Sequence, residues 1–234
     1  MAPIPPQRPA KISVPAKPFP FELPLARTAL LAIDLQRDFL LPGGFGDVQS
    51  GTQLAAVQNI VPACEELLAL FRDHSLPVVH TREGHLPDLS DCPTSKTSRS
   101  PTGKKIGDEG LPKSRLLVRG EHGHNFHDPF TPLPDETVID KPGKGAFWNT
   151  GLLEELRALA VTHLVIMGVT TECCVSTTVR EANDRGFECC TYPYPPHPPS
   201  THAHKKKWGR SEARSFCFIL FCFSPRRPLF FSGK

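Results

Sequence analysis

HLVIMGVTTECCVSTT, residues 163–178, is the stretch that decides the fold of this chain. Its first part is a run of apolar, partly β-branched residues that ends at Gly168, which is typical of a buried strand. A Thr-Thr pair follows that can cap a helix, and helical residues continue to Gly186. The stretch predicts a strand, a turn and a helix, with Cys174 in the first turn of that helix.

Cys174 is a candidate nucleophile because of this position. Helix N-termini stabilise anions, so a thiol in the first turn is shifted toward the nucleophilic thiolate. Open α/β sheets also bind ligands at the carboxyl ends of their strands. A cysteine in a helix is more often a small buried hydrophobe, and Cys173 in the same turn is not excluded by physics.

Two other predicted strands end at ionisable residues. The apolar run at residues 29–33 ends at Asp34, and the run at residues 137–140 is followed by Lys141. A buried carboxylate is costly unless it is paired or its pKa is shifted. Taken alone, Asp34 could be a strand-end aspartate that is hydrogen-bonded to a loop, and Lys141 could be a surface lysine. Taken together with Cys174, they place an Asp, a Lys and a Cys at three strand ends.

Strands and helices alternate through the rest of the chain. Further strands are expected at residues 76–80 and 187–190, and helices with one apolar face at residues 57–71 and 152–159. Residues 82–134 carry little regular signal and are expected to cover the active site. The alternation predicts a three-layer α/β/α fold with a central parallel sheet and helices on both faces.

These segments resemble the isochorismatase-like cysteine hydrolases, which include nicotinamidases, N-carbamoylsarcosine amidases, ureidoacrylate hydrolases and biuret hydrolases. Asp34 lies in the family's D-x-Q-x-D-F motif, Lys141 precedes F-x-x-T, and Cys174 lies in G-V-x-T-x-x-C-V. The spacing from Gly168 favours Cys174 over Cys173. Residues 81–85, 119–124 and 180–187 are closest to the biuret, ureidoacrylate and N-carbamoyl amidohydrolases.

The resemblance implies a cysteine-dependent hydrolase that cleaves a C–N bond of a small amide or ureido/carbamoyl compound through a thioester. Asp34 would move the proton, Lys141 would stabilise charge and Cys174 would attack. Backbone N–H groups of Thr170 and Cys174 would form the oxyanion hole, and the Val169–Thr170 peptide would be cis. Lys144, in a glycine-rich turn, is expected to matter little.

Substrate contacts are expected from Phe39, Arg82 and Trp148, although packing or surface charge explains each equally well. No cofactor or metal is expected, because CxxC spacing is absent and the region after Phe45 lacks the Asp-x-His metal element of nicotinamidases. The loop histidines 122, 124 and 127 match no metal site of the family.

Composition limits the class of partner. The 234 residues carry a net charge of +3, which predicts no nucleic-acid or membrane partner, and no stretch approaches the length of a spanning helix. The N-terminus lacks a secretory pattern, so we expect a cytoplasmic protein with free thiols. The expected partner is a small amide or ureide, and homo-oligomers remain open.

Three segments are expected: a proline-rich arm at residues 1–27, the hydrolase domain at residues 28–190 and a tail at residues 191–234 that departs from the family and is expected to be disordered. The tail would leave the fold incomplete at its C-terminal end. A read-through intron, a frameshift or a splice form would explain it, and a genuine interaction tail is the competing interpretation. Alternatives are therefore an inactive truncated family member or scaffold, and an isochorismatase-type vinyl-ether hydrolase, a class that lacks the cysteine.

Overall fold

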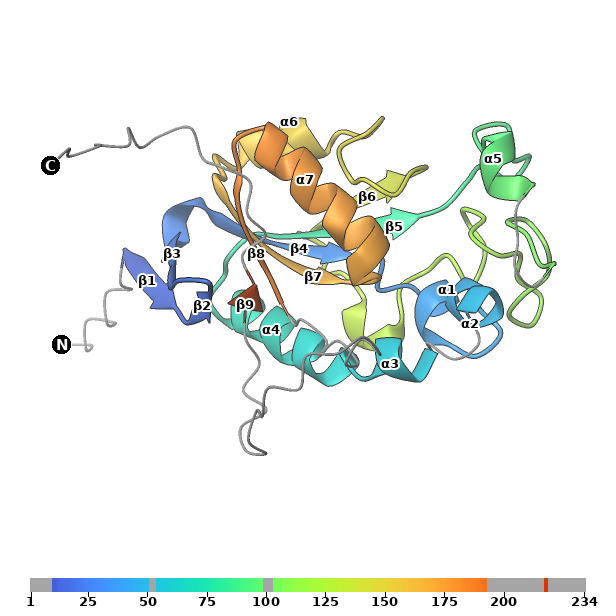
Figure 1. Ribbon diagram of the computed structural model, residues 1–234, viewed down its shortest axis with the longest axis horizontal. Helices are drawn as coiled ribbons and strands as arrows, with labels where there is room; N and C mark the ends of the chain where they lie inside the picture. The colour runs from blue at the N-terminus through green and yellow to red at the C-terminus, as the bar shows by residue number, and fades with distance from the viewer. Residues whose placement is uncertain (1–9, 51–53, 99–102, 193–216, 219–234) are drawn as a thin grey trace, which may run out of the picture.

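The computed structural model describes residues 10–50, 54–98, 103–192 and 217–218 (Figure 1). At its centre five parallel strands lie in the order β8-β7-β4-β5-β6. Their bounds are β4 (Thr28–Ile33), β5 (Val78–Glu83), β6 (Thr137–Lys141), β7 (His163–Gly168) and β8 (Glu188–Thr191). All five predicted strands exist, and the predicted α/β/α architecture is confirmed.

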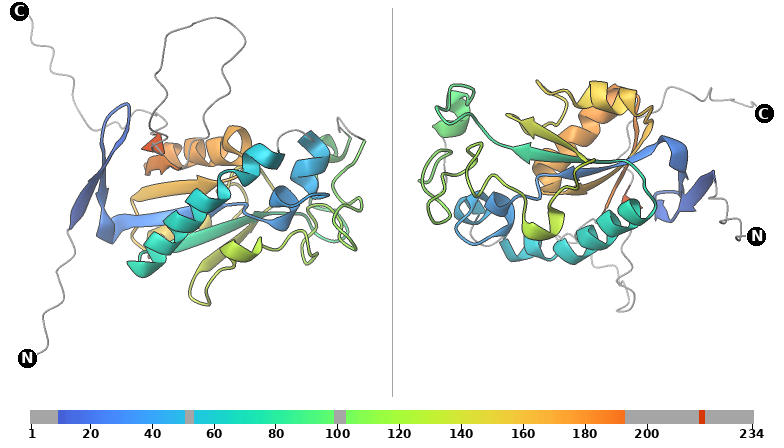
Figure 2. Two further views of the ribbon diagram at one scale, coloured as in Figure 1. Left: turned by 90° about the horizontal axis from the view of Figure 1, so that it is seen from below. Right: turned by 180° about the vertical axis from the view of Figure 1, so that it is seen from behind.

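Alternating side chains of β4 divide the core into two layers. Leu30 and Ala32 pack with Cys64 and Phe71 of α4 (Val61–Asp73) on one face of the sheet. The intervening residues of β4 pack on the other face against α6 (Leu152–Ala158) and α7 (Ser176–Asp184). Figure 2 shows the sheet between these layers. The apolar runs of β4 and β7 are continuous because both faces of these strands are covered.

Short elements surround the end of the sheet toward which β4 and β5 point (Figure 1). They are α1 (Arg37–Leu40), α2 (Phe45–Ser50), α3 (Leu54–Gln58), α5 (Thr94–Thr97), the 3-10 turn η2 (Asp128–Phe130) and the π-helical turn η3 (Thr171–Val175). Little regular structure was predicted for residues 82–134; β5 runs on to Glu83, and the described part of the rest contains only the short α5 and η2. The carboxyl ends of the strands therefore lie beneath a cover of loops.

From Lys11 to Arg27 the N-terminal segment contains regular elements. β1 (Lys11–Val14) pairs antiparallel with β3 (Phe21–Pro24), and the 3-10 turn η1 (Leu25–Arg27) leads into β4. Phe21 and Leu23 alternate into the core and fix this two-stranded sheet to the domain. The domain boundary at residue 27 stays a prediction.

One helical stretch corrects the expectation about membrane spans. By length and composition alone, Leu54–Asp73 could cross a membrane, with a mean hydropathy of 1.4. Its residues Cys64, Leu68 and Phe71 are buried against the sheet, so a folded domain already uses part of this apolar surface. The absence of a membrane partner stays a prediction.

The C-terminal edge of the sheet is bordered by a short element. β9 (Cys217–Phe218) pairs antiparallel with β8 at Thr191 and parallel with β2 (Ala16–Lys17). Residues 193–216 and 219–234 lie outside the described part of the chain, so the predicted tail stays a prediction.

A mainly apolar cavity of about 450 Å³ lies beside Cys190 and α4. The expectation of free thiols fails at Cys190, which is disulfide-bonded, and is met at Cys64, Cys92, Cys173, Cys174 and Cys189.

Candidate active site

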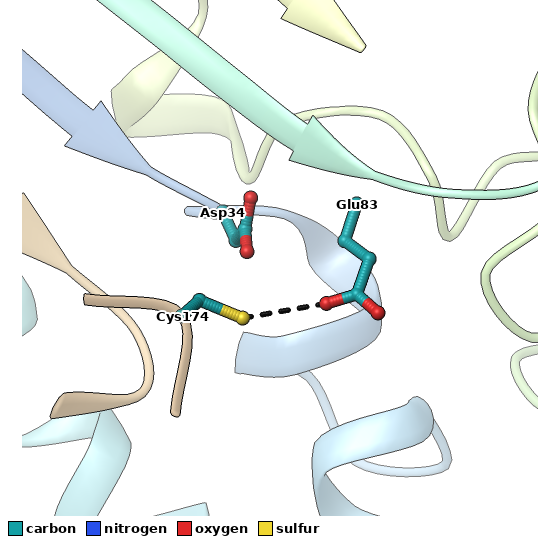
Figure 3. A group of neighbouring side chains, drawn as sticks. All are labelled: Asp34, Glu83 and Cys174. Atoms are coloured by element: carbon teal, nitrogen blue, oxygen red, sulfur yellow. Dashed lines mark hydrogen bonds between the residues drawn. The ribbon is translucent and has the colours of Figure 1, made fainter. Parts of the chain in front are cut away.

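Side chains from the ends of four neighbouring strands meet at the carboxyl edge of the sheet. Asp34 follows β4, Glu83 ends β5, Lys141 ends β6, and Cys174 lies in η3 just beyond β7. The strand register accounts for the meeting, because Glu83 is paired with Lys141 and Ile33 with Gly168. Figure 3 shows Asp34, Glu83 and Cys174 turned toward one another, and all four side chains are buried.

Asp34 and Lys141 form a buried ion pair. Lys141 Nζ lies 2.7 Å from Asp34 Oδ2, and the Thr81 hydroxyl donates to Asp34 Oδ1 over 2.7 Å. Lys141 also donates to the carbonyl oxygens of Gly143 and Lys144, over 2.9 and 3.2 Å. These bonds fix the ammonium at the strand end, so Lys141 is not the surface lysine that its residue type alone would suggest.

The Asp34 carboxylate and the Lys141 ammonium each shift the pKa of the other. Burial raises the pKa of Asp34 above its ordinary value, against the opposing effect of the Lys141 ammonium. Burial would lower the pKa of Lys141, but the Asp34 carboxylate and its acidic neighbours hold that pKa above its usual range. Lys141 therefore stays charged, while Asp34 is a stronger base than an exposed aspartate.

Glu83 is a member of the cluster that the sequence analysis missed. Its Oε2 atom accepts a hydrogen bond from Cys174 Sγ over 3.3 Å and lies 3.6 Å from Lys141 Nζ. Its Oε1 atom lies 2.8 Å from Lys96 Nζ and 3.0 Å from Lys144 Nζ. The signal was present, because Glu83 also ends a strand. β5 was expected to end at residue 80, which left Glu83 in a loop.

Three ammonium groups keep Glu83 ionised. Burial alone would raise the pKa of Glu83, but Lys141, Lys144 and Lys96 outweigh burial and hold that pKa well below its usual range. The Gln36 side chain fixes the same strand end by accepting from the Glu83 N–H over 2.8 Å and donating to the Glu83 carbonyl over 3.0 Å. The carboxylate is thus a fixed acceptor and a weak base.

A chain of polar contacts continues outward from Glu83. Lys96 Nζ lies 3.2 Å from His85 Nε2, and His85 Nδ1 lies 3.3 Å from Asp91 Oδ1. Lys96 also donates to the Pro142 carbonyl over 2.8 Å. Lys96 thereby ties the segment that contains α5 to the ends of β5 and β6.

Cys174 differs from the thiolate that its place at a helix start predicted. A hydrogen bond with Cys173, burial and the Asp34 carboxylate raise the pKa of Cys174 well above its ordinary value. The same hydrogen bond and the Lys144 ammonium lower the pKa of the half-buried Cys173 to about 6. The hydrogen bond with Cys173, burial and the two nearby carboxylates together outweigh the helix start, so the resting nucleophile is a thiol, which lies 3.3 Å from Glu83 Oε2.

The turn between β7 and Cys174 is fixed by Gly168. Its φ is +122°, and a Cβ atom there would lie 2.0 Å from the Ile33 carbonyl oxygen. Val169 N–H donates to that oxygen over 2.9 Å, and the Val169–Thr170 peptide is cis, as the resemblance implied. Thr170 precedes η3 and accepts from the Cys173 N–H over 3.1 Å. The oxyanion hole of Thr170 and Cys174 N–H groups stays a prediction.

The predicted substrate contacts are placed in three different environments. Arg82 points away from the cluster and forms a two-bond ion pair with Asp140, because adjacent strand residues face opposite sides. Phe39 is buried, and its ring meets the Phe45 ring edge to face. Lys144 Nζ lies 5.8 Å from the centre of the Phe45 ring. Trp148 is exposed, and its ring lies over Gly143. The structure does not bring Arg82 to the cluster.

Metal binding is disfavoured by the chemistry of the cluster. Within the described ranges, ligand atoms gather in one group, Asp34, Glu83 and Cys174, all within 4.8 Å of one another. Lys141 Nζ already lies 2.7 and 3.6 Å from the two carboxylates, where a cation would bind. His122, His124 and His127 form no such group among the described residues.

Comparisons with known proteins agree with this architecture. The isochorismatase domain model matches residues 28–193. Ureidoacrylate amidohydrolase RutB of Methylobacterium radiotolerans is 30% identical over 179 residues, covering 75% of this chain and 69% of the relative. An isochorismatase family protein of Desulfovibrio vulgaris has a TM-score of 0.58 at 28% identity, with 70% of this chain and 77% of that structure covered.

N-carbamoylsarcosine amidase of Thermoplasma acidophilum shares the fold, with a TM-score of 0.53 at 22% identity over 70% of this chain and 78% of that structure. The family match covers most of the chain, and the four converging strand ends lie inside it. This chain belongs to the isochorismatase domain family.

Proposed function

We propose that this chain is a cysteine-dependent hydrolase that cleaves a C–N bond in a small amide or ureido/carbamoyl compound through a thioester. The observation that supports the proposal is the convergence of Cys174, Asp34 and Lys141 in one buried cluster. The similarity to a ureidoacrylate amidohydrolase supports the same substrate class. The predicted cytoplasmic location and the small-molecule partner belong to this proposal.

Acylation needs a proton acceptor for the Cys174 thiol. Asp34 suits this role, because burial raises the pKa of Asp34, whereas the pKa of Glu83 is held low. Glu83 orients the thiol through its 3.3 Å contact, and Asp34 takes the proton as sulfur attacks the carbonyl carbon. The Lys141 ammonium stabilises the negative charge that sulfur and Asp34 carry while the proton moves between them.

The tetrahedral intermediate then collapses with transfer of a proton from Asp34 to the leaving nitrogen. For a ureido substrate with a terminal amide, ammonia leaves and a thiocarbamate ester of Cys174 remains. Asp34, again ionised, takes a proton from water, and the hydroxide attacks the acyl carbon. Return of that proton to sulfur regenerates the thiol and releases the acid. The N–H groups of Thr170 and Cys174 would bind the oxyanion in both steps.

Ammonia release from a panel of amides and ureides tests the proposal. Cys174→Ala should abolish release without changing the melting temperature, and intact-protein mass spectrometry should detect the acyl adduct in the unchanged protein. Cys173→Ala is the matched control and should retain most activity. A dead Cys173→Ala variant beside an active Cys174→Ala variant would reject the assignment of the nucleophile.

A further inference from the structure

Two adjacent thiols in η3 differ in exposure and in charge. Both are free, but Cys174 is only 3% exposed whereas Cys173 is half-buried. A side-chain hydrogen bond joins them, and it raises the pKa of Cys174 while it lowers the pKa of Cys173 to about 6. At neutral pH the inner sulfur therefore keeps its proton, and the outer sulfur carries the negative charge.

The Lys144 ammonium lies on the same outer side of the cluster. Its Nζ atom bonds to the Glu83 carboxylate at 3.0 and 3.3 Å, and its side chain is 36% exposed. The positive charge of Lys144 stabilises the Cys173 thiolate. The turn that carries Lys144 was expected to matter little, yet it places an ammonium group beside a thiolate that solvent reaches.

The backbone of η3 holds the two sulfurs together. The Cys173 N–H donates to the Thr170 carbonyl over 3.1 Å, and the Val175 N–H donates to the same oxygen over 3.2 Å. A solvent-accessible thiolate beside a second thiol is the arrangement of cysteines that sense oxidants, because the second thiol resolves the oxidised first one. Cys173 has the first position in this arrangement and Cys174 has the second.

We propose that Cys173 is a modification site, where a hydroperoxide reversibly inactivates the catalytic cluster by joining Cys173 to Cys174 in a disulfide. In the first step the Cys173 thiolate attacks a peroxide oxygen. An S–O bond forms, the O–O bond breaks, hydroxide or alkoxide leaves, and Cys173 becomes a sulfenic acid. In the second step the Cys174 sulfur attacks the Cys173 sulfur. The thiol proton passes to the departing hydroxyl group, so water leaves as the S–S bond forms.

The disulfide would remove the nucleophile, and it would be easy to reduce. Consecutive Cα atoms are about 3.8 Å apart, which is closer than the ~4.4–6.8 Å that disulfides prefer. Strained disulfides are the readily reduced ones, so a small thiol should restore both cysteines. The loss of turnover rests on the proposed function, whereas formation of the disulfide does not.

Hydrogen peroxide is the probe, and mass spectrometry of the unreduced protein is the readout. Trypsin releases residues 158–180 as one peptide, whose only cysteines are Cys173 and Cys174. At pH 7 this peptide should lose the mass of two hydrogen atoms and resist iodoacetamide. Ammonia release should fall in parallel, and dithiothreitol should restore both the thiols and the activity.

Cys173→Ala separates this route from direct oxidation of the nucleophile. The variant should keep most of its activity and lose it to peroxide at least about 10-fold more slowly, because the remaining Cys174 is mainly protonated at pH 7. Without its partner, Cys174 should go on to the sulfinic acid, so dithiothreitol should not restore activity. Cys92→Ala is the matched control, since Cys92 is another free, partly exposed cysteine, and its pKa is raised by burial. It should respond to peroxide like the unchanged protein.

Three results would overturn the proposal. They are equally fast and equally reversible inactivation of Cys173→Ala, oxygen added to Cys174 in the unchanged protein without a disulfide, and a peptide that peroxide leaves unaltered. Turnover separates the two levels of the argument. A reversible disulfide in a protein that releases ammonia from no amide or ureide would reject the proposed function and support the modification site. Ammonia release that persists after the disulfide has formed would reject the inactivation by Cys173.

Discussion

Replacing Glu83 by Gln should lower the pKa of the Cys174 thiol. In the structure the Glu83 carboxylate lies 3.3 Å from Cys174 Sγ, with both groups buried. At an effective dielectric constant of ~20, two unit charges at this separation repel each other by about 5 kcal/mol. Each pKa unit corresponds to about 1.4 kcal/mol, so the upper limit of the change is about 3.7 units.

Rearrangement of the lysines will reduce this change. Lys96 and Lys144 lose their shared partner in Glu83→Gln and can turn toward solvent, whereas Lys141 stays fixed by Asp34. We therefore expect a decrease of about 2 to 3 units, below the electrostatic upper limit. The amide can still accept from the thiol, so the main change is the loss of negative charge.

The pH dependence of iodoacetamide alkylation measures the thiol pKa directly. The measurement is made in a Cys173→Ala background, because the two thiols titrate together. Glu136→Gln is the control, since Glu136 is a paired carboxylate bonded to Arg72 and His80 instead of Cys174. A Cys174 pKa that stays constant or rises in Glu83→Gln would refute the reasoning that the carboxylate keeps the thiol protonated.

Four further predictions follow from single contacts. Asp34→Asn should abolish the pre-steady-state burst of ammonia, because an amide cannot take the thiol proton; a normal burst with stalled turnover would confine Asp34 to the water step. Gly168→Ala should destabilise the fold by more than about 3 kcal/mol in urea titrations, because its Cβ would collide with the Ile33 carbonyl; an unchanged midpoint would contradict the collision. Burial raises the pKa of Asp38 to about 6, so this carboxyl binds its proton more tightly in the folded state; stability should fall by about 2 kcal/mol as pH rises from 4 to 7, and Asp38→Asn should remove that slope in melts across this range. A version with a family-like C-terminus beside β8 should be more stable by several kcal/mol, because each Å² of apolar surface that it covers contributes about 25 cal/mol. If the present chain shows a sharp melt above ~55 °C and robust ureide hydrolysis, its own tail already stabilises the domain.

Much of the fold and three of the four cluster residues could be predicted from local sequence. The strands at β4, β6 and β7 are short apolar runs that end at a polar residue or a glycine, and local pattern is enough to find such ends. Asp34, Lys141 and Cys174 can therefore be identified from the sequence. The sequence did not predict the hairpin of β1 and β3. Only two apolar residues, Phe21 and Leu23, alternate there, and prolines flank them on both sides.

Glu83 and Lys144 show where local pattern fails. β5 continues beyond residue 80 through Thr81 and Arg82, polar residues that resemble a loop in sequence. Their partners are distant in the chain, because Thr81 bonds to Asp34 and Arg82 bonds to Asp140 of β6. The turn after Lys141 looks solvent-exposed in sequence, yet it curls back and delivers the Lys144 ammonium to Glu83.

The sequence by itself determined which strands form and which three residues stand at their ends, because side-chain periodicity and turn residues act over a few positions. Only the tertiary structure decided the ionisation of the cluster. The pKa of Cys174 depends on its neighbour Cys173, but also on burial and on Asp34 and Glu83, which are distant in the chain. The charge of Glu83 in turn depends on lysines from other segments of the chain. Electrostatic energy falls with distance in space and is indifferent to distance along the chain, so no local pattern could give it.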